Sequence, residues 1–173
     1  GSDNVRGGAR ATSHMLNLGR RRIAFLGDTD APEVLQRYEG YVDAHRRAGL
    51  TIDPELTVPA NFEVESAEAA LGMLLERGIP FDGVFAASDL IGLGVIRCLL
   101  RAGVSVPGDV SVVGYDNLQL AAYSHPSLTT ISQDMGKAGR IMVSKLLASG
   151  ETGVMRSERL PTELIVRESC GLA

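Results

Sequence analysis

The chain has 173 residues, 45% of them hydrophobic, which is enough for one domain with a sizeable buried core. Its formal net charge of -4, with no block of like charges beyond three arginines at 20–22, argues against direct binding of nucleic acid or an anionic membrane by this segment. No apolar run approaches the roughly 20 residues of a membrane span.

Helices and short apolar strands alternate up to Pro126. Apolar residues at helical spacing predict a helix over 8–18, and the next apolar run predicts a strand at 22–26. The repeated order of strand, helix and strand predicts an α/β fold with a doubly wound parallel sheet and right-handed crossovers. The later elements expected here are a helix from 34 to 48, a strand at 57–58, a helix at 67–75, a strand at 83–87, a helix at 90–99 and a strand at 110–115.

The alternation changes beyond Pro126. A short strand is expected at 129–132 and a helix at 135–147. A loop with glycines at 150–153 and a last strand at 164–166 complete the chain.

Polar side chains follow four of the predicted strands. Open parallel sheets bind ligands beyond the carboxyl ends of their strands, so these side chains can converge on one site. Hydrogen-bonding groups and one aromatic ring suit a polyol or a heterocycle, although α/β domains without a site also carry polar loops there. The residues are Asp28, Thr29, Asp30, Asn61, Phe62, Glu63, Ser88, Asp89, Asp116 and Asn117.

Several strings, in a fixed order, point to a known family. The clearest are Val-Pro-x-Asp-Val-Ser-Val-Val-Gly-Tyr-Asp at 106–116, Pro-x-Leu-Thr-Thr-Ile at 126–131 and Leu-Pro-Thr-Glu-Leu-x-Val-Arg-Glu-Ser-Cys at 160–170. Arg-x-x-Gly-Tyr at 37–41 and Phe-Ala-Ala-Ser-Asp at 85–89 agree with them. With these strings the chain resembles the LacI/GalR family of bacterial transcriptional repressors.

The resemblance covers nearly the whole chain but begins in the middle of the family pattern, without the DNA-binding helix-turn-helix, the hinge and most of the first effector subdomain. It implies a periplasmic-binding-protein-like (type I) fold, here the C-terminal subdomain with remnants of the N-terminal subdomain. The implied parts are a remnant helix of the N-terminal subdomain at 1–20, the C-terminal effector-binding subdomain at 21–126, a crossover strand and helix of the N-terminal subdomain at 127–150 and a return strand at 151–173.

Two of these remnants have apolar faces that would lack their usual sheet. They are the helix at 8–18 and the segment at 129–147. We expect them to pack on each other or on another copy of the chain, because an exposed apolar patch favours association. The residues concerned are Met15, Leu18, Ile141, Met142 and Leu146.

The resemblance implies two main effector contacts. Arg37 falls on the family's effector-binding arginine, and its planar fork suits bidentate contacts; the alternative is a solvated helix arginine. Asp116 matches the carboxylate that accepts hydrogen bonds from ligand hydroxyls or amines. Many members of the family have a second Asp where Asn117 stands, so the resemblance does not imply which ligand is bound.

Four further residues are weaker candidates. Phe62 falls where some family members stack an aromatic ring on the ligand, although it could equally be a core phenylalanine. Ser88 matches a polar contact position and could also, or instead, cap the helix that follows. Asp28 and Glu33, in and after the loop of the first strand, complete the expected effector site.

The resemblance also implies a mechanism for the intact protein. A small effector, sugar or purine-like, would bridge two subdomains and stabilise one closure angle, which would set operator affinity. Operator DNA would be bound only through an N-terminal domain absent from this chain. A homodimer would form through 90–100 and 118–123, although a wide buried helix explains the apolar residues of the first segment as well.

Two other classes of protein are possible. A periplasmic sugar-binding protein of an ABC transporter shares the fold class but would need an export signal, which the upstream sequence would decide, and the Val-Ser-Val-Val-Gly-Tyr-Asp and Arg-Glu-Ser-Cys strings resemble repressors instead. The N-terminus of this chain lacks the apolar core of a signal peptide, and a cytoplasmic location is expected. An enzyme is not expected, because the chain has no nucleophile elbow, His-Glu-x-x-His motif or phosphate loop. Cys98 and Cys170 are far apart and have no metal-ligand spacing, so neither a disulfide framework nor a zinc site is expected, and a reducing compartment is the simpler interpretation. No cofactor is expected.

Overall fold

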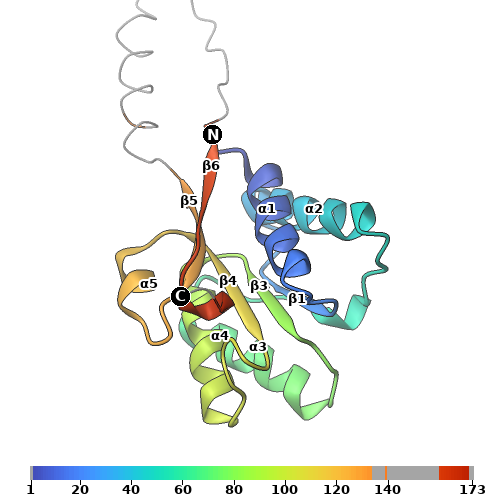
Figure 1. The fold of residues 1–173 in the computed structure, drawn as a ribbon, viewed down its shortest axis with the longest axis vertical. Helices are drawn as coiled ribbons and strands as arrows, with labels where there is room; N and C mark the ends of the chain where they lie inside the picture. The colour runs from blue at the N-terminus through green and yellow to red at the C-terminus, as the bar shows by residue number, and fades with distance from the viewer. Residues whose placement is uncertain (1, 134–138, 140–159, 172–173) are drawn as a thin grey trace, which may run out of the picture.

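Six strands form one sheet in a computed structural model that describes residues 2–133, 139 and 160–171 (Figure 1). The strand order is β2-β1-β3-β4-β5-β6; the first five strands run parallel, and β6 runs antiparallel to β5. The predicted α/β class with a largely parallel sheet is confirmed. The strands are β1 (Ile23–Leu26), β2 (Thr57–Val58), β3 (Gly83–Ala86), β4 (Ser111–Asp116), β5 (Thr129–Gln133) and β6 (Thr162–Ile165).

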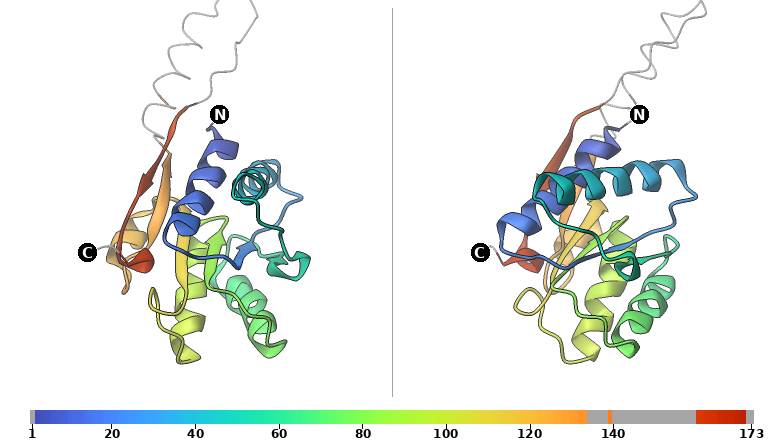
Figure 2. Two further views of the ribbon diagram at one scale, coloured as in Figure 1. Left: turned by 45° about the vertical axis from the view of Figure 1, so that its right-hand side comes forward. Right: turned by 90° about the vertical axis from the view of Figure 1, so that its right-hand side faces the viewer.

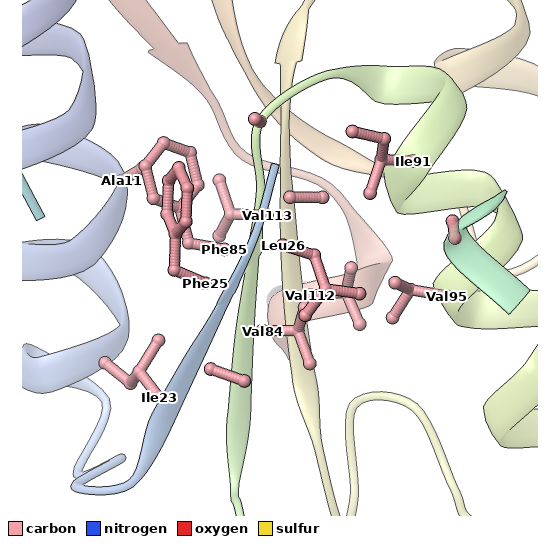
Figure 3. Close-up of a cluster of buried hydrophobic side chains, with 14 of the residues drawn as sticks. Ala11, Ile23, Phe25, Leu26, Val84, Phe85, Ile91, Val95, Val112 and Val113 are labelled. Atoms are coloured by element: carbon pink, nitrogen blue, oxygen red, sulfur yellow. The ribbon is translucent and has the colours of Figure 1, made fainter. Parts of the chain in front are cut away.

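Helices cover both faces of this sheet. Helices α1 and α2 lie side by side, as do α3 and α4, and the strands pass between α1 and α4 (Figures 2 and 3). The helices are α1 (Asn4–Asn17), α2 (Pro32–Arg47), α3 (Val64–Glu76), α4 (Asp89–Arg101) and the short α5 (Gln119–Tyr123), with two 3-10 turns at η1 (Pro54–Leu56) and η2 (Glu168–Cys170). The predicted helix at 135–147 and the loop at 150–153 lie outside the described residues, apart from residue 139.

Apolar side chains fill the space on both faces of the central strands. On the side of α1, the rings of Phe25 and Phe85 meet edge to face with centroids 5.5 Å apart. On the other side, Val84 and Val112 lie toward Val95 of α4 (Figure 3). Each of these residues is fully buried. The continuous apolar runs of β1 and β3 are therefore explained by helices that cover both faces of the sheet.

Helix α1 belongs to the same layered unit as the sheet. Met15 is fully buried, and its sulfur would lie 3.2 Å from a Cβ placed on Gly83 of β3. The expectation that Met15 would lack a sheet is therefore wrong, because the helix packs beside α2 on this chain's own strands. Leu18 is 41% exposed. The division of the chain at 20, 126 and 150 stays a prediction.

Candidate functional site

A buried arginine lies at the carboxyl ends of β3 and β4. Arg37, in α2, is only 5% exposed. Its Nη1 donates to the carbonyl of Ala87 at 2.5 Å and its Nε donates to Asn4 Oδ1 at 3.2 Å. The centre of the guanidinium lies 3.8 Å from the centroid of the Tyr115 ring, a cation–π geometry. These contacts fix the guanidinium plane at the sheet edge.

Asp116, the last residue of β4, completes this arrangement. Its Oδ1 lies 3.4 Å from Arg37 Nη2 and accepts a hydrogen bond from Gln133 Nε2 at 2.6 Å. Burial raises the pKa of Asp116, while Arg37 and Gln133 lower it and the charge of Glu33 raises it further. The side chain is still 31% exposed. The site thus joins a fixed cation to a carboxylate that solvent can reach.

The structure places the other predicted site residues in different settings. Ser88 is buried, and its hydroxyl accepts from the Ile91 amide at 3.3 Å, so the helix-capping role is confirmed. Asp28 accepts from the Asp30 amide in the turn after β1. Glu33 is exposed in the first turn of α2. Their contact with an effector stays a prediction.

Phe62 lies in the loop before α3 and is 42% exposed. The alternative of a core phenylalanine is therefore wrong. An exposed ring at the carboxyl edge of a sheet can stack on a ligand, although the described hydrogen bonds tie it to no other member of the site. The predicted stacking role remains open to test.

Sequence reasoning missed three residues of the arrangement. Asn4 follows the N-cap of α1 and donates to Gln36 while it accepts from Arg37. Tyr115 was assigned only to an apolar strand. Gln133 ends β5, and its position beside Asp116 follows from the register in which Ser132 pairs with Asp116. The sequence offered no local signal for Gln133, because it does not specify which residue of β5 pairs with Asp116.

The arrangement suits recognition of a polar small molecule. The carboxylate accepts hydrogen bonds from hydroxyl or amine groups, and the guanidinium donates them. In the part of the chain that the structure describes, His, Cys, Asp and Glu side chains form no group of three or more that could hold a metal ion. Within those same ranges, no helix combines the length and the apolarity needed to cross a bilayer.

Comparison with known proteins identifies the family. The model of the periplasmic binding protein-like domain matches residues 12–170. The HTH-type transcriptional regulator CelR of Thermobifida fusca is 40% identical over 170 residues, which cover 96% of this chain and 50% of CelR. The chain spans about half the length of the curated relatives it matches.

Solved structures agree with the sequence match. A sugar-binding transcriptional regulator of the LacI family from Escherichia coli, complexed with phosphate, has a TM-score of 0.90 at 29% identity, covering 97% of this chain and 61% of that one. A complex of the transcriptional regulator CelR with cellobiose has a TM-score of 0.87 at 36% identity, covering 97% and 52%. These relatives are regulators rather than enzymes. The chain therefore belongs to the periplasmic-binding-protein-like domain family, among the domains of LacI-family transcriptional regulators.

Proposed function

We propose that this chain is the effector-binding part of a LacI-type transcriptional repressor, and that a sugar or purine-like molecule binds beside Arg37 and Asp116. The observation that carries the proposal is the pairing of a buried, fully oriented guanidinium with a carboxylate that is 31% exposed, 3.4 Å apart. Similarity to a CelR complex with cellobiose supports a sugar over other polar ligands.

The geometry supplies what a hydroxylated ligand needs. Arg37 uses Nη1 and Nε for contacts within the protein. Its side chain is therefore already ordered, and ligand binding does not have to restrict it further. Asp116 Oδ1 is engaged by Gln133, which leaves its second oxygen for a ligand hydroxyl. The exposed ring of Phe62 can cover an apolar sugar face.

In the intact protein the effector would act by a shift between conformations. An effector held between this sheet edge and a second subdomain stabilises one closure angle only if it binds the conformation with that angle more tightly than the others. DNA binding would belong to other parts of the protein, in keeping with similarity to an HTH-type regulator. Exposed apolar side chains on α4 and around α5 support a homodimer; they are Leu100, Leu118, Leu120 and Tyr123.

The alternative, a sugar-binding protein of an ABC transporter, shares the fold and the ligand chemistry. The relatives reported above are transcriptional regulators, and this similarity favours the repressor.

Isothermal titration of the intact protein with cellobiose, glucose, ribose and adenosine tests the proposal. We expect saturable binding of one compound and a loss of at least about tenfold in affinity in Asp116→Asn, since a charge-assisted hydrogen bond contributes roughly 1.5–3 kcal/mol. Asp53→Asn is the matched control, because Asp53 is 30% exposed and also pairs with an arginine, Arg22. Equal losses in both variants would overturn the proposed site.

A further inference from the structure

The turn after β4 has an unusual backbone. Asp116 and Asn117 have φ values of 103° and 53°, in the left-handed region that L residues other than glycine rarely adopt. Such residues persist only where the surrounding structure holds them in place. Asp116 is the partly exposed carboxylate of the proposed site, so the groups that hold this turn also set the position of that carboxylate.

Asp89, the first residue of α4, is in a position to hold the turn. It is fully buried. Its Oδ2 accepts from the Leu118 amide at 2.6 Å, and its Oδ1 accepts from the Thr130 hydroxyl, also at 2.6 Å. The Thr130 oxygen in turn accepts from the Asn117 amide at 3.2 Å. One carboxylate therefore anchors two consecutive amides, one directly and one through a hydroxyl.

Glycine at position 114 allows the Asp89 carboxylate to approach β4 closely. A Cβ on Gly114 of β4 would collide with Asp89 Oδ1, so the glycine permits the close approach. From the other side of the turn, Arg167 donates to Asn117 Oδ1 at 2.8 Å and to the Leu128 carbonyl at 2.7 Å. The turn is thus held between a buried carboxylate on one side and a guanidinium on the other.

The charges facing Asp89 come from two elements. The pKa of Asp89 is raised to about 6, mainly by burial and also by the charge of Asp116, while hydrogen bonds from Thr130 and Leu118 and the charge of Arg167 act in the opposite direction. A carboxyl group this buried is a costly anchor, because its ionised form must be held by these donors alone.

We propose that Asp89 is a positioning residue of the effector site, which holds the 116–118 turn so that Asp116 stays against Arg37 and Gln133. The role of Asp89 in effector binding rests on the proposed function, but its effect on the position of Asp116 does not. Asp89 also holds the amide of Leu118, the N-cap of α5, so the site carboxylate and the exposed apolar residues of α5 share one support.

The test compares Asp89→Asn, which keeps the shape and one carbonyl acceptor, with Asp89→Ala, which keeps neither. Both remove the negative charge, so a difference between them reports position. NMR titration of the Asp116 carboxyl should give a higher pKa in the alanine variant, because Arg37 and Gln133, which lower that pKa, lose their fixed partner. Amide exchange at Leu118 should be at least about tenfold faster in the alanine variant, given the strength of hydrogen bonds to charged groups.

Equal Asp116 titrations and equal Leu118 exchange in the two variants would overturn the proposal. If the alanine variant does not fold, Thr130→Val removes the relay to Asn117 and should speed exchange of that amide by a similar factor; unchanged exchange would overturn the proposal too. Asp109→Ala is the control, because Asp109 anchors the Ser105 amide in a different turn. None of these measurements needs an effector, so a failed effector screen leaves their outcome intact.

Discussion

Gly40 of α2 packs directly on the backbone of Gly8 in α1. A Cβ on Gly40 would lie 3.0 Å from the Gly8 carbonyl carbon and 2.6 Å from the Ala9 nitrogen, and it would collide with the Val5 carbonyl oxygen. A Cβ on Gly8 would in turn collide with the carbonyl oxygen of Arg37. The two helices approach this closely because glycine stands at both positions, and the approach places Asn4 beside the Arg37 side chain.

Gly40→Ala should therefore destabilise the fold by about 2 kcal/mol or more, since backbone atoms cannot yield to a methyl group as side chains do. Gly72→Ala is the control, because a Cβ there would meet no atom within 4 Å and alanine favours a helix. Urea unfolding should show a gain of about 0.5 kcal/mol for the control. A Gly40 variant as stable as the parent protein would contradict the close packing.

Replacing Arg37 should cost far more than replacing an exposed arginine of the same helix. Arg37→Met removes hydrogen bonds to Ala87 and Asn4 and leaves Asp116 without its cation, so a loss of about 3 kcal/mol is expected. Arg46, whose side chain is 77% exposed, pairs with Asp43, and Arg46→Met should change stability by less than about 0.5 kcal/mol. Denaturant melts of both variants would check the contrast, which similar losses would refute.

Ser88→Ala should lower the free energy of unfolding by about 1 kcal/mol through loss of the cap on α4. Ser88→Gly should lower it by only a few tenths, because glycine tolerates the cap backbone. Thermal unfolding of the two variants provides the measurement. If alanine proves as stable as serine, the hydroxyl does not act as a cap.

Tyr115→Phe tests a buried hydroxyl. Tyr115 is fully buried, burial raises its pKa to about 12, and its oxygen has no hydrogen-bond partner among the residues the structure describes. Phenylalanine keeps the ring under Arg37 and removes the unsatisfied group, so stability should stay level or rise by about 1 kcal/mol. A loss above about 1 kcal/mol in chemical denaturation would reveal a partner for the hydroxyl.

Asp89 should make stability depend on pH. Its pKa rises from 3.8 to about 6 on folding, so between these values the folded protein retains a proton that the unfolded chain has released. The free energy of unfolding therefore falls as pH rises through this window and levels off above it. Relative to Asp89→Asn, the parent protein should lose about 1 kcal/mol between pH 5 and pH 7, measured by urea unfolding at constant ionic strength. A difference in unfolding free energy between the two proteins that does not change with pH would contradict the raised pKa of Asp89.

The repeating part of the fold could be predicted because its strands are continuous apolar runs between helices of regular period. Strands β2 and β3 and helix α4 lie within one or two residues of their predicted limits. Helix α5 escaped prediction because five residues make little more than one turn and show no period. The start of α1 at Asn4 was missed because Asp3, which caps it by accepting from the Arg6 amide, precedes a stretch with two glycines.

The part of the site that follows from a strand end and from the Arg-x-x-Gly-Tyr motif could be predicted. Arg37 and Asp116 were named from the sequence, and the structure brings them together. Gln133 and Tyr115 were missed for a different reason. The place of Gln133 depends on the register between β5 and β4, and the place of Tyr115 depends on which face of β4 its ring occupies; neither is encoded in a local pattern.

The antiparallel pairing of β5 with β6 sets how segment 134–159 is attached. Gln133 and Thr162 are register partners, so the chain leaves and re-enters the sheet within about one strand spacing, roughly 5 Å. A short turn in place of residues 134–161 could therefore join β5 to β6 as an ordinary hairpin, with the order of the six described strands unchanged.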